Sequence, residues 1–395
     1  MRDSLTDEVV RLGQLDESYR RLNPPQRTLF GPDLSNPSPR AVQGLIASLE
    51  GAHDADFQRV ATEARALAAR VFQTTTGAVA ILPALEEAVP EAALSSLLRP
   101  HAKVVVGVCG AYGDHLAATA RHLGHAVAVV EAPRGQAIPV ARLAEVVRRD
   151  RPDALMLMHG EGATGVEQSL AGLGEACHAG EALFLVDAAF TLGGVELAFD
   201  RWSIDVAWSG TQRCLSALPG LALVAVSARA QERLTATSPS YLHLGKALAG
   251  AYETFPAPLL YALDEVLQLS NEQGMAYRFS RHINRRDALV AGVEALGLHV
   301  VAEPGVRLPS VTAVRVPDKL DGEEIRRALL SRFRLEIGGP VDPVLGSVWR
   351  IGIMGHSTTP ANLLLFLSAL EVLLEERGWA VSRGAAARAA LTVLT

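Results

Sequence analysis

Lysine is almost absent from this chain of 395 residues, and long apolar runs are missing. Lysine occurs only at Lys103, Lys246 and Lys319, so nearly all of the 37 basic residues are arginines. The formal net charge of −6 is mild, and no basic stripe or recognised binding motif is present, which argues against a nucleic-acid partner. Every apolar run is shorter than a membrane-spanning helix requires, so we expect no membrane segment.

Cysteine is also scarce, with three residues, Cys109, Cys177 and Cys214. Their spacing matches neither a disulfide framework nor a metal site, so we predict no bound metal and a reducing compartment. The N-terminus, MRDSLTDEVVRL, is charged and lacks the apolar region of a signal peptide. These features together predict a cytoplasmic protein.

Short apolar runs alternate with helical patterns after Pro100. The runs are AKVVVGVCG, HAVAVVEA, DALMLMHG and ALFLVDAA. Strands that are apolar along their whole length, with helices between them, are typical of a mostly parallel sheet covered on both faces. The sequence therefore predicts an α/β protein, and its 49% of hydrophobic residues suits a large buried core.

The length allows a large domain and a smaller one. We expect an N-terminal arm over residues 1–27, a large domain over 28–265, a small C-terminal α+β domain over 266–380 and a tail over 381–395. A long helical pattern from Leu259 to Leu296 crosses between the two domains, and Asp321 is placed to cap the helix that follows it.

Polar residues follow two of the predicted strands directly. ALFLVD ends in Asp187, and DVAW is followed by Ser209, Gly210, Thr211, Gln212 and Arg213. Because open α/β sheets bind ligands at the carboxyl edge of their strands, these side chains predict a site there. Three further motifs frame this stretch: LFGPDLSNPSPR near the N-terminus, HGEGATG at residues 159–165, and WRIGIMG at residues 349–355.

These ordered motifs resemble those of the class V, fold-type I pyridoxal-phosphate aminotransferases, the alanine–glyoxylate and serine–pyruvate group. The resemblance spans roughly Leu29 to Gly378 and implies a fold-type I transferase that acts on a small amino or keto acid. It implies that Asp187 binds the pyridine nitrogen, that Ser209 and Gln212 lie at the cofactor, and that Arg350 pairs with the substrate carboxylate. The residue after S-G-T-Q is the family's Schiff-base lysine, and here it is Arg213.

The remaining cofactor contacts also come from the resemblance. Tyr112 is the aromatic residue expected to stack on the pyridine, and Thr164 belongs to the loop beside the ring. Tyr252 and Thr254 correspond to the residues that bind the cofactor phosphate of a neighbouring subunit, which implies a homodimer.

A turn rich in hydroxyl groups, Gln73–Gly77, precedes a second helical pattern that continues through Ala88. A helix N-terminus favours anions, because free N–H groups and the helix dipole converge there. Threonines in this position are more often plain helix caps. The resemblance favours Thr76, Gly77 and Ala78 as contacts of the cofactor phosphate.

Three departures affect the chemistry. An arginine keeps its proton and has no free amine to condense with an aldehyde, so Arg213 cannot replace the lysine. Ala163 and Ala78 stand where the family has side chains that reach the cofactor. We therefore expect pyridoxal or pyridoxamine phosphate to be held non-covalently, if it is bound at all.

Three functions remain open at this stage. The first is an aminotransferase-type enzyme without a covalent tether, and the second is a binding or regulatory scaffold that has lost transamination. The third is an enzyme with new chemistry in the same pocket, where Cys214 beside Arg213 could have a lowered pKa, although an inert buried thiol is the better expectation. An engineered Lys→Arg change would not explain the two alanines.

Overall fold

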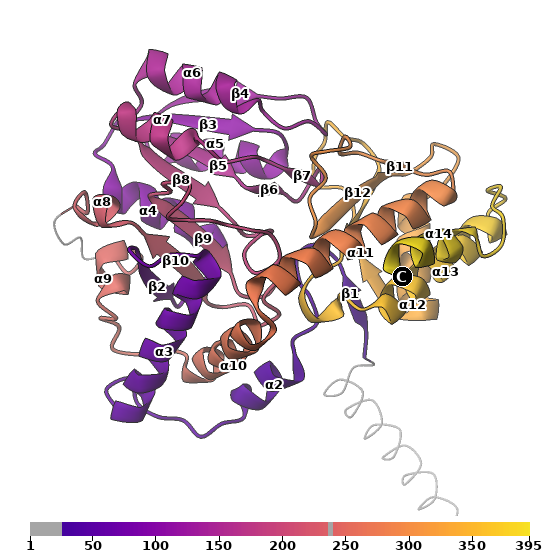
Figure 1. The fold of residues 1–395 in the computed structure, drawn as a ribbon, viewed down its shortest axis with the longest axis horizontal. Coiled ribbons are helices and arrows are strands. Elements are labelled where there is room, and N and C mark those ends of the chain that lie inside the picture. The colour runs from indigo at the N-terminus through magenta and orange to yellow at the C-terminus, as the bar shows by residue number, and fades with distance from the viewer. Residues whose placement is uncertain (1–25, 236–239) are drawn as a thin grey trace, which may run out of the picture.

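A seven-stranded sheet forms the centre of the larger part of the chain (Figure 1). The computed structural model describes residues 26–235 and 240–395. The strand order is β2-β10-β9-β8-β5-β3-β4, and every neighbouring pair is parallel except the two pairs made by β10. The strands are β2 (Ala78–Leu82), β3 (Lys103–Val108), β4 (Ala126–Glu131), β5 (Ala154–Met158), β8 (Leu183–Asp187), β9 (Val206–Gly210) and β10 (Ala222–Val226).

Helices cover both faces of this sheet, because its strands carry apolar side chains on each side. One face packs against α3 (Ala55–Phe72), α6 (Val140–Asp150), α7 (Leu173–Ala179) and α10 (Ala257–Gln273). The opposite face packs against α4 (Val89–Leu97), α5 (Ala111–His122) and α9 (Leu244–Leu248). Shorter elements complete this part: α2 (Pro39–Leu45), η1 (Glu86–Ala88), β6 (Gly160–Glu161), β7 (Val166–Glu167) and α8 (Ala228–Gln231).

The smaller part is built on an antiparallel sheet of β11 (His299–Val300), β12 (Val311–Arg315) and β14 (Val348–Gly352). Beside it, β1 (Thr28–Phe30) pairs in parallel with β13 (Leu335–Ile337). A separate apolar core joins these strands to the helices of this part. The helices are α11 (Met275–Ala295), α12 (Gly322–Phe333), η2 (Gly355–Ser357), α13 (Pro360–Glu376) and α14 (Ala385–Leu394).

The mostly parallel sheet and the smaller C-terminal α+β part confirm the predicted fold class. Asp321 caps α12 as expected, because its carboxylate accepts hydrogen bonds from the backbone N–H groups of Glu323 and Glu324. None of the helices in residues 26–235 and 240–395 has the length and apolarity to cross a membrane.

Residues 78–88 differ from the predicted helix. Residues 78–82 form strand β2, and the helix α4 begins only at Val89. The run AVAIL is buried in the sheet against β10, so tertiary pairing decided between two conformations that a short apolar run allows. This change moves the helix N-terminus, and with it the favoured anion position, to the turn at residues 83–88.

The long helical pattern from Leu259 to Leu296 is interrupted at Gly274. This residue has a φ of +77°, in the left-handed region, and it ends α10 and begins α11. In Figure 1, α11 extends from the larger part across to the smaller one, so the break sets the direction of the connection between them.

The structure also differs from the expected tail over residues 381–395. Residues 385–394 form α14, which packs against α11 and α13. Its Ala386 and Ala390 are fully buried in the core of the smaller part. The alanine-rich segment is therefore an integral layer of this part of the fold.

We predict that Ala390→Glu destabilises the protein by at least about 2 kcal/mol, because it places an unpaired charge in an apolar core. Urea unfolding should show the loss, and Thr392→Glu, on the exposed side of the same helix, should change stability by less than about 1 kcal/mol. Equal stability of the two variants would contradict the docking of α14.

Candidate functional site

The strand registers bring several segments to one edge of the sheet. Met158 and Asp187 are level with each other in neighbouring strands, as are Asp187 and Trp208. Strand β10 runs back between β9 and β2, so that Ala222 pairs with both Gly210 and Leu82. The turn after β2 therefore arrives at the same edge as the ends of β5, β8 and β9.

A buried ion pair lies at this edge between Glu86, in the turn after β2, and Arg213, just beyond β9. One guanidinium nitrogen of Arg213 contacts Glu86 Oε1, and the two side chains are only 6% and 4% exposed. Gln212 Nε2 donates to both carboxylate oxygens of Glu86, at 2.7 and 2.9 Å. Arg213 Nε also donates to the carbonyl oxygen of Pro32 at 3.2 Å. Arg213 is therefore engaged through both Nε and Nη1.

Asp187 lies at the end of β8, close enough to Glu86 and Arg213 for their charges to act on it. Its Oδ1 accepts a hydrogen bond of 2.8 Å from the backbone N–H of Ala189. Burial raises the pKa of Asp187 to about 7, although this hydrogen bond and the charge of Arg213 act in the opposite direction. Near neutral pH this carboxyl can therefore exist in both protonation states.

Phe190 separates Arg213 from the loop at residues 159–165. Its ring centroid lies 4.4 Å from Arg213 Cζ and 4.9 Å from the Tyr112 ring. A Cβ atom added at Gly162 would lie 2.3 Å from Phe190 Cζ, so the ring packs directly against that backbone. The guanidinium is consequently enclosed between an aromatic face and the Glu86 carboxylate.

Arg350 comes from strand β14 of the smaller part and contacts Tyr112. We call the region between the sheet edge at Asp187 and Arg350 the cleft. The Arg350 side chain is 4% exposed, its Nε donates to the carbonyl oxygen of Gly339 at 2.7 Å, and its Nη1 donates to the Tyr112 hydroxyl at 3.2 Å. Among the described residues, Arg350 forms an ion pair with Asp33, with 3.7 Å between Nη2 and Oδ2, and the Asp33 side chain is 60% exposed. Arg350 also lines a cavity of about 330 Å³ with Gly338 and Gly339.

Glu161 is buried beneath the N-terminus of α5. Its carboxylate accepts hydrogen bonds from the backbone N–H groups of Gly113 and Ala163, both at 3.0 Å. Burial raises its pKa to about 7, against the effect of these hydrogen bonds. Glu161 thus positions Tyr112 and the 159–165 loop relative to each other.

Two expected hydroxyl groups and a histidine lie nearby. Thr164 is fully buried, and its Oγ1 has no hydrogen-bond partner within the described ranges, whereas Ser209 Oγ donates to the carbonyl oxygen of Gly210. His159 Nδ1 lies 2.9 Å from Thr191 Oγ1, and burial lowers its pKa to about 3. His159 is therefore neutral at physiological pH and is suited to a structural hydrogen bond.

Cys214 follows Arg213 but does not behave as an activated thiol. Its Sγ is buried and lies 3.6 Å from the carbonyl oxygen of Phe190. Burial raises its pKa to about 12, and this effect outweighs the lowering by the nearby arginines. The inert buried thiol expected from the sequence is confirmed, and the alternative of a lowered thiol pKa is not.

Thr76, Gly77 and Ala78 are not brought to the site. They lie at the start of β2, whereas the site lies at its end, roughly 13 Å away along the strand. Thr76 Oγ1 instead donates to Asp200 at 3.0 Å. The assignment as phosphate contacts came from the resemblance, with residues 78–88 read as a helix, and strand β2 separates these residues from the cleft.

Tyr252 and Thr254 have different environments. Tyr252 is 5% exposed, contacts Tyr241 and Phe255, and donates from its hydroxyl to the carbonyl oxygen of Tyr241 at 3.3 Å. Thr254 is exposed. Tyr252 is therefore part of the core of its own chain, and Thr254 is open to contact with another molecule.

Glu86 and Phe190 were missed by the sequence analysis. Glu86 belongs to the segment predicted as helix, and no motif distinguishes it from its neighbour Glu87, which is exposed. Phe190 follows Asp187 by three residues and reads as an ordinary core residue. The absence of a lysine at position 213 could have prompted a search for a carboxylate that pairs with Arg213. Glu86 becomes a candidate for this partner only when residues 78–82 are assigned as a strand.

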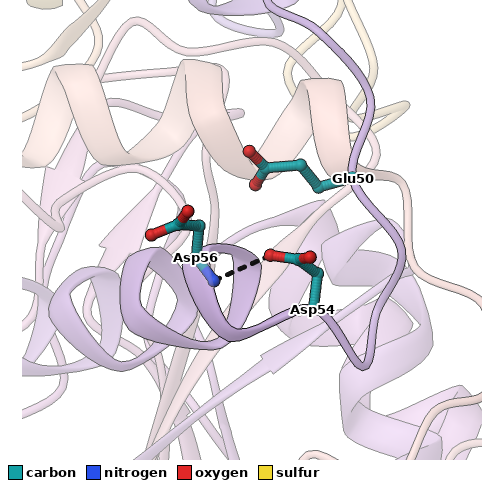
Figure 2. A group of neighbouring side chains, drawn as sticks. All are labelled: Glu50, Asp54 and Asp56. Carbon is teal, nitrogen blue, oxygen red and sulfur yellow. Dashed lines mark hydrogen bonds between the residues drawn. The ribbon is translucent and has the colours of Figure 1, made fainter.

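Three carboxylates form a group on the surface, and none of them is among the cleft residues described above. Figure 2 shows Glu50, Asp54 and Asp56, which are exposed and have oxygens within 4.8 Å of one another. Asp54 caps α3 by accepting from the N–H of Asp56 at 2.8 Å, and Glu50 accepts from the Tyr261 hydroxyl at 2.9 Å. These contacts account for the positions of Asp54 and Glu50.

The sequence is similar to known transaminases over nearly its whole length. Residues 48–337 match the family model described as Aminotransferase class-V. The chain is 31% identical over 402 residues to the (S)-ureidoglycine–glyoxylate transaminase of Bacillus subtilis, and the alignment covers 95% of this chain and 97% of that protein. It is 35% identical over 369 residues to the alanine–glyoxylate aminotransferase of Callithrix jacchus, with 90% and 89% covered.

Solved structures agree with these sequence matches. The ureidoglycine–glyoxylate aminotransferase of Bacillus subtilis superimposes with a TM-score of 0.89 at 31% identity, covering 94% of this chain and 98% of that one. The pyridoxamine–pyruvate aminotransferase of Mesorhizobium loti gives a TM-score of 0.87 at 26% identity, with 93% and 96% covered. The similarity includes both parts of the fold.

The residues at the cleft do not fit a pyridoxal-type cofactor in this arrangement. The amine donor is missing at Arg213, whose guanidinium is already paired with Glu86. Glu86 also lies against the end of β9, because a Cβ added at Gly210 would be 2.3 Å from Glu86 Oε2. A cofactor phosphate would add roughly two negative charges beside the Glu86 carboxylate, which already accepts from Gln212 and Arg213.

We predict that Glu161→Gln changes the pH dependence of stability. The folded pKa of Glu161 is about 7, above its ordinary value of 4.5, so the folded state holds the extra proton between these pH values. Parent stability should therefore fall as pH rises from about 4.5 to 7 and level off above 7. The variant has no titrating group at this position and lacks this loss. Between pH 4.5 and 7 its free energy of unfolding should therefore rise, relative to that of the parent, by on the order of 3 kcal/mol.

Urea unfolding at pH 5 and pH 8 would measure this difference. Glu145→Gln, at an exposed position of α6, is the matched control and should leave the pH profile of the parent unchanged. The same pH profile for the parent and for Glu161→Gln would contradict the assignment.

Proposed function

The chain belongs to the class V aminotransferase family, with the fold-type I architecture, and from this premise we propose that it binds a small amino or keto acid through Arg350. The observation that carries the proposal is a buried arginine without a buried carboxylate partner in the described ranges, placed at the wall of a cavity. The relatives are transaminases of alanine, ureidoglycine and glyoxylate by name, which favours small carboxylic acids as ligands.

The geometry around Arg350 supports recognition of a carboxylate. Gly339 holds Nε, and Tyr112 accepts from Nη1, so the planar guanidinium is oriented before any ligand arrives. Asp33 lies at 3.7 Å on an exposed loop and can be displaced by a ligand carboxylate. Burial makes the resulting ion pair stronger than it would be on the surface.

The cofactor of this family is of the pyridoxal phosphate type, and it supplies an aldehyde that accepts and returns an amino group. We propose that this chain never carries such a cofactor as a Schiff base at position 213, so that any uptake is non-covalent. Support comes from the chemistry of Arg213, which has no free amine. The relatives are named as transaminases, which favours amino and keto acids as the ligands of this chain.

Two further proposals concern assembly and location. We propose a homodimer, supported by the family resemblance and by the exposure of Thr254 on the surface of the single chain. We also propose a cytoplasmic location, supported by three cysteines that are buried as free thiols.

We predict that Arg350→Gln weakens the binding of pyruvate or glyoxylate by roughly 10- to 100-fold, because charge-assisted hydrogen bonds to the ligand are lost. Isothermal titration calorimetry with each acid would measure this. Arg315→Gln, on the neighbouring strand β12 at an exposed position, is the control and should leave binding unchanged. Equal affinity of Arg350→Gln and the parent would overturn the proposed ligand site.

We also predict that borohydride treatment with added pyridoxal phosphate leaves no stoichiometric pyridoxyl group on the chain. The three lysines are the only side-chain amines available, and none stands at position 213. Peptide mass spectrometry of the reduced protein would detect such a group. A stoichiometric adduct at Lys103, Lys246 or Lys319 would show that another lysine replaces the missing one.

A further inference from the structure

The cofactor side of the cleft is filled by side chains of the chain itself. We propose that Glu86, Arg213 and Phe190 together occupy the cofactor site, so that the chain excludes pyridoxal phosphate until Glu86 and Arg213 are replaced together. This proposal concerns the ends of β2, β8 and β9, and it does not depend on ligand binding at Arg350.

The position of Glu86 is the first argument. The turn that contains it leads into α4 at the carboxyl edge of the sheet, where open α/β folds bind ligands and where a helix N-terminus favours an anion. In this chain the turn places a buried carboxylate at that edge. The carboxylate points toward Gln212 and Arg213, so a negative group is already present where a ligand phosphate would be expected.

The hydrogen bonds of Glu86 are the second argument. Gln212 and Arg213 follow β9 closely, and both direct donors to the Glu86 carboxylate. A phosphate arriving at this edge would have to compete with Glu86 for those donors.

The packing of Phe190 is the third argument, because this ring covers the guanidinium of Arg213. The ring is 1% exposed and contacts Gly162, Tyr112 and the guanidinium of Arg213. Tyr112, which the resemblance predicts to stack on a pyridine, contacts this ring instead. The 330 Å³ cavity beside Arg350 is lined by neither Asp187 nor Arg213, so it does not extend to the ion pair.

A double variant that replaces both Glu86 and Arg213 tests this proposal. In Glu86→Gly/Arg213→Lys, the carboxylate is gone and the new amine can condense with the aldehyde of added pyridoxal phosphate, releasing water. We expect pyridoxal phosphate to bind this variant more tightly than the parent by roughly 100-fold or more, with a visible absorbance band. Borohydride reduction should then fix the pyridoxyl group at position 213.

Matched variants separate the roles of the side chains. Arg213→Lys alone retains Glu86, which should pair with the new ammonium and keep the site closed. Glu87→Gly/Arg213→Lys removes the neighbouring exposed glutamate and should also bind weakly. If circular dichroism shows that the glycine impairs folding, Glu86→Gln/Arg213→Lys removes the charge without adding backbone freedom. Phe190→Ala can be added to this variant to enlarge the space.

Either of two results would overturn the proposal. One is saturable, micromolar binding of pyridoxal phosphate to the parent, since the intact ion pair would then not exclude it. The other is a folded Glu86→Gln/Arg213→Lys/Phe190→Ala variant that still does not bind the cofactor. Titration of the parent with pyruvate in parallel reports on Arg350, so failure of the proposed ligand site would be seen separately.

Discussion

The buried ion pair between Glu86 and Arg213 is the interaction on which the arrangement of the cleft depends. Each partner is almost inaccessible to water, and removing one would leave the other as an uncompensated charge, which typically costs about 3–5 kcal/mol. The pair also joins the turn after β2 to the end of β9, and Arg213 extends the connection to Pro32. Three segments distant in sequence are thereby held at one edge of the sheet.

The sheet topology makes this ion pair possible. Because β10 runs antiparallel between β9 and β2, the ends of β2 and β9 are level, and side chains beyond them can meet. The same edge receives Asp187 from β8 and the loop that contains Glu161 from β5. The fold is shared with transaminases, and in this chain the carboxyl edge of its sheet carries the Glu86–Arg213 ion pair.

The two halves of the cleft differ in what they offer a ligand. On the side of the smaller part, Arg350 is oriented by Tyr112 and Gly339 beside a cavity. On the side of the sheet, Arg213 pairs with the Glu86 carboxylate and stacks on the Phe190 ring. Burial raises the pKa of Asp187 there, which is the expected effect when a carboxyl faces other side chains in place of solvent.

The sequence by itself determined the features that depend on local patterns. Apolar runs that alternate with helical patterns predicted the parallel sheet. Asp187, the last residue of one strand, and Arg213, shortly after another, lie at the sheet edge as expected. The sequence did not identify Glu86, because AVAIL is short enough for helix or strand and only pairing with β10 decides between them. Nor did it identify the burial of α14 or Phe190, since which surface an apolar side chain covers is decided by tertiary packing.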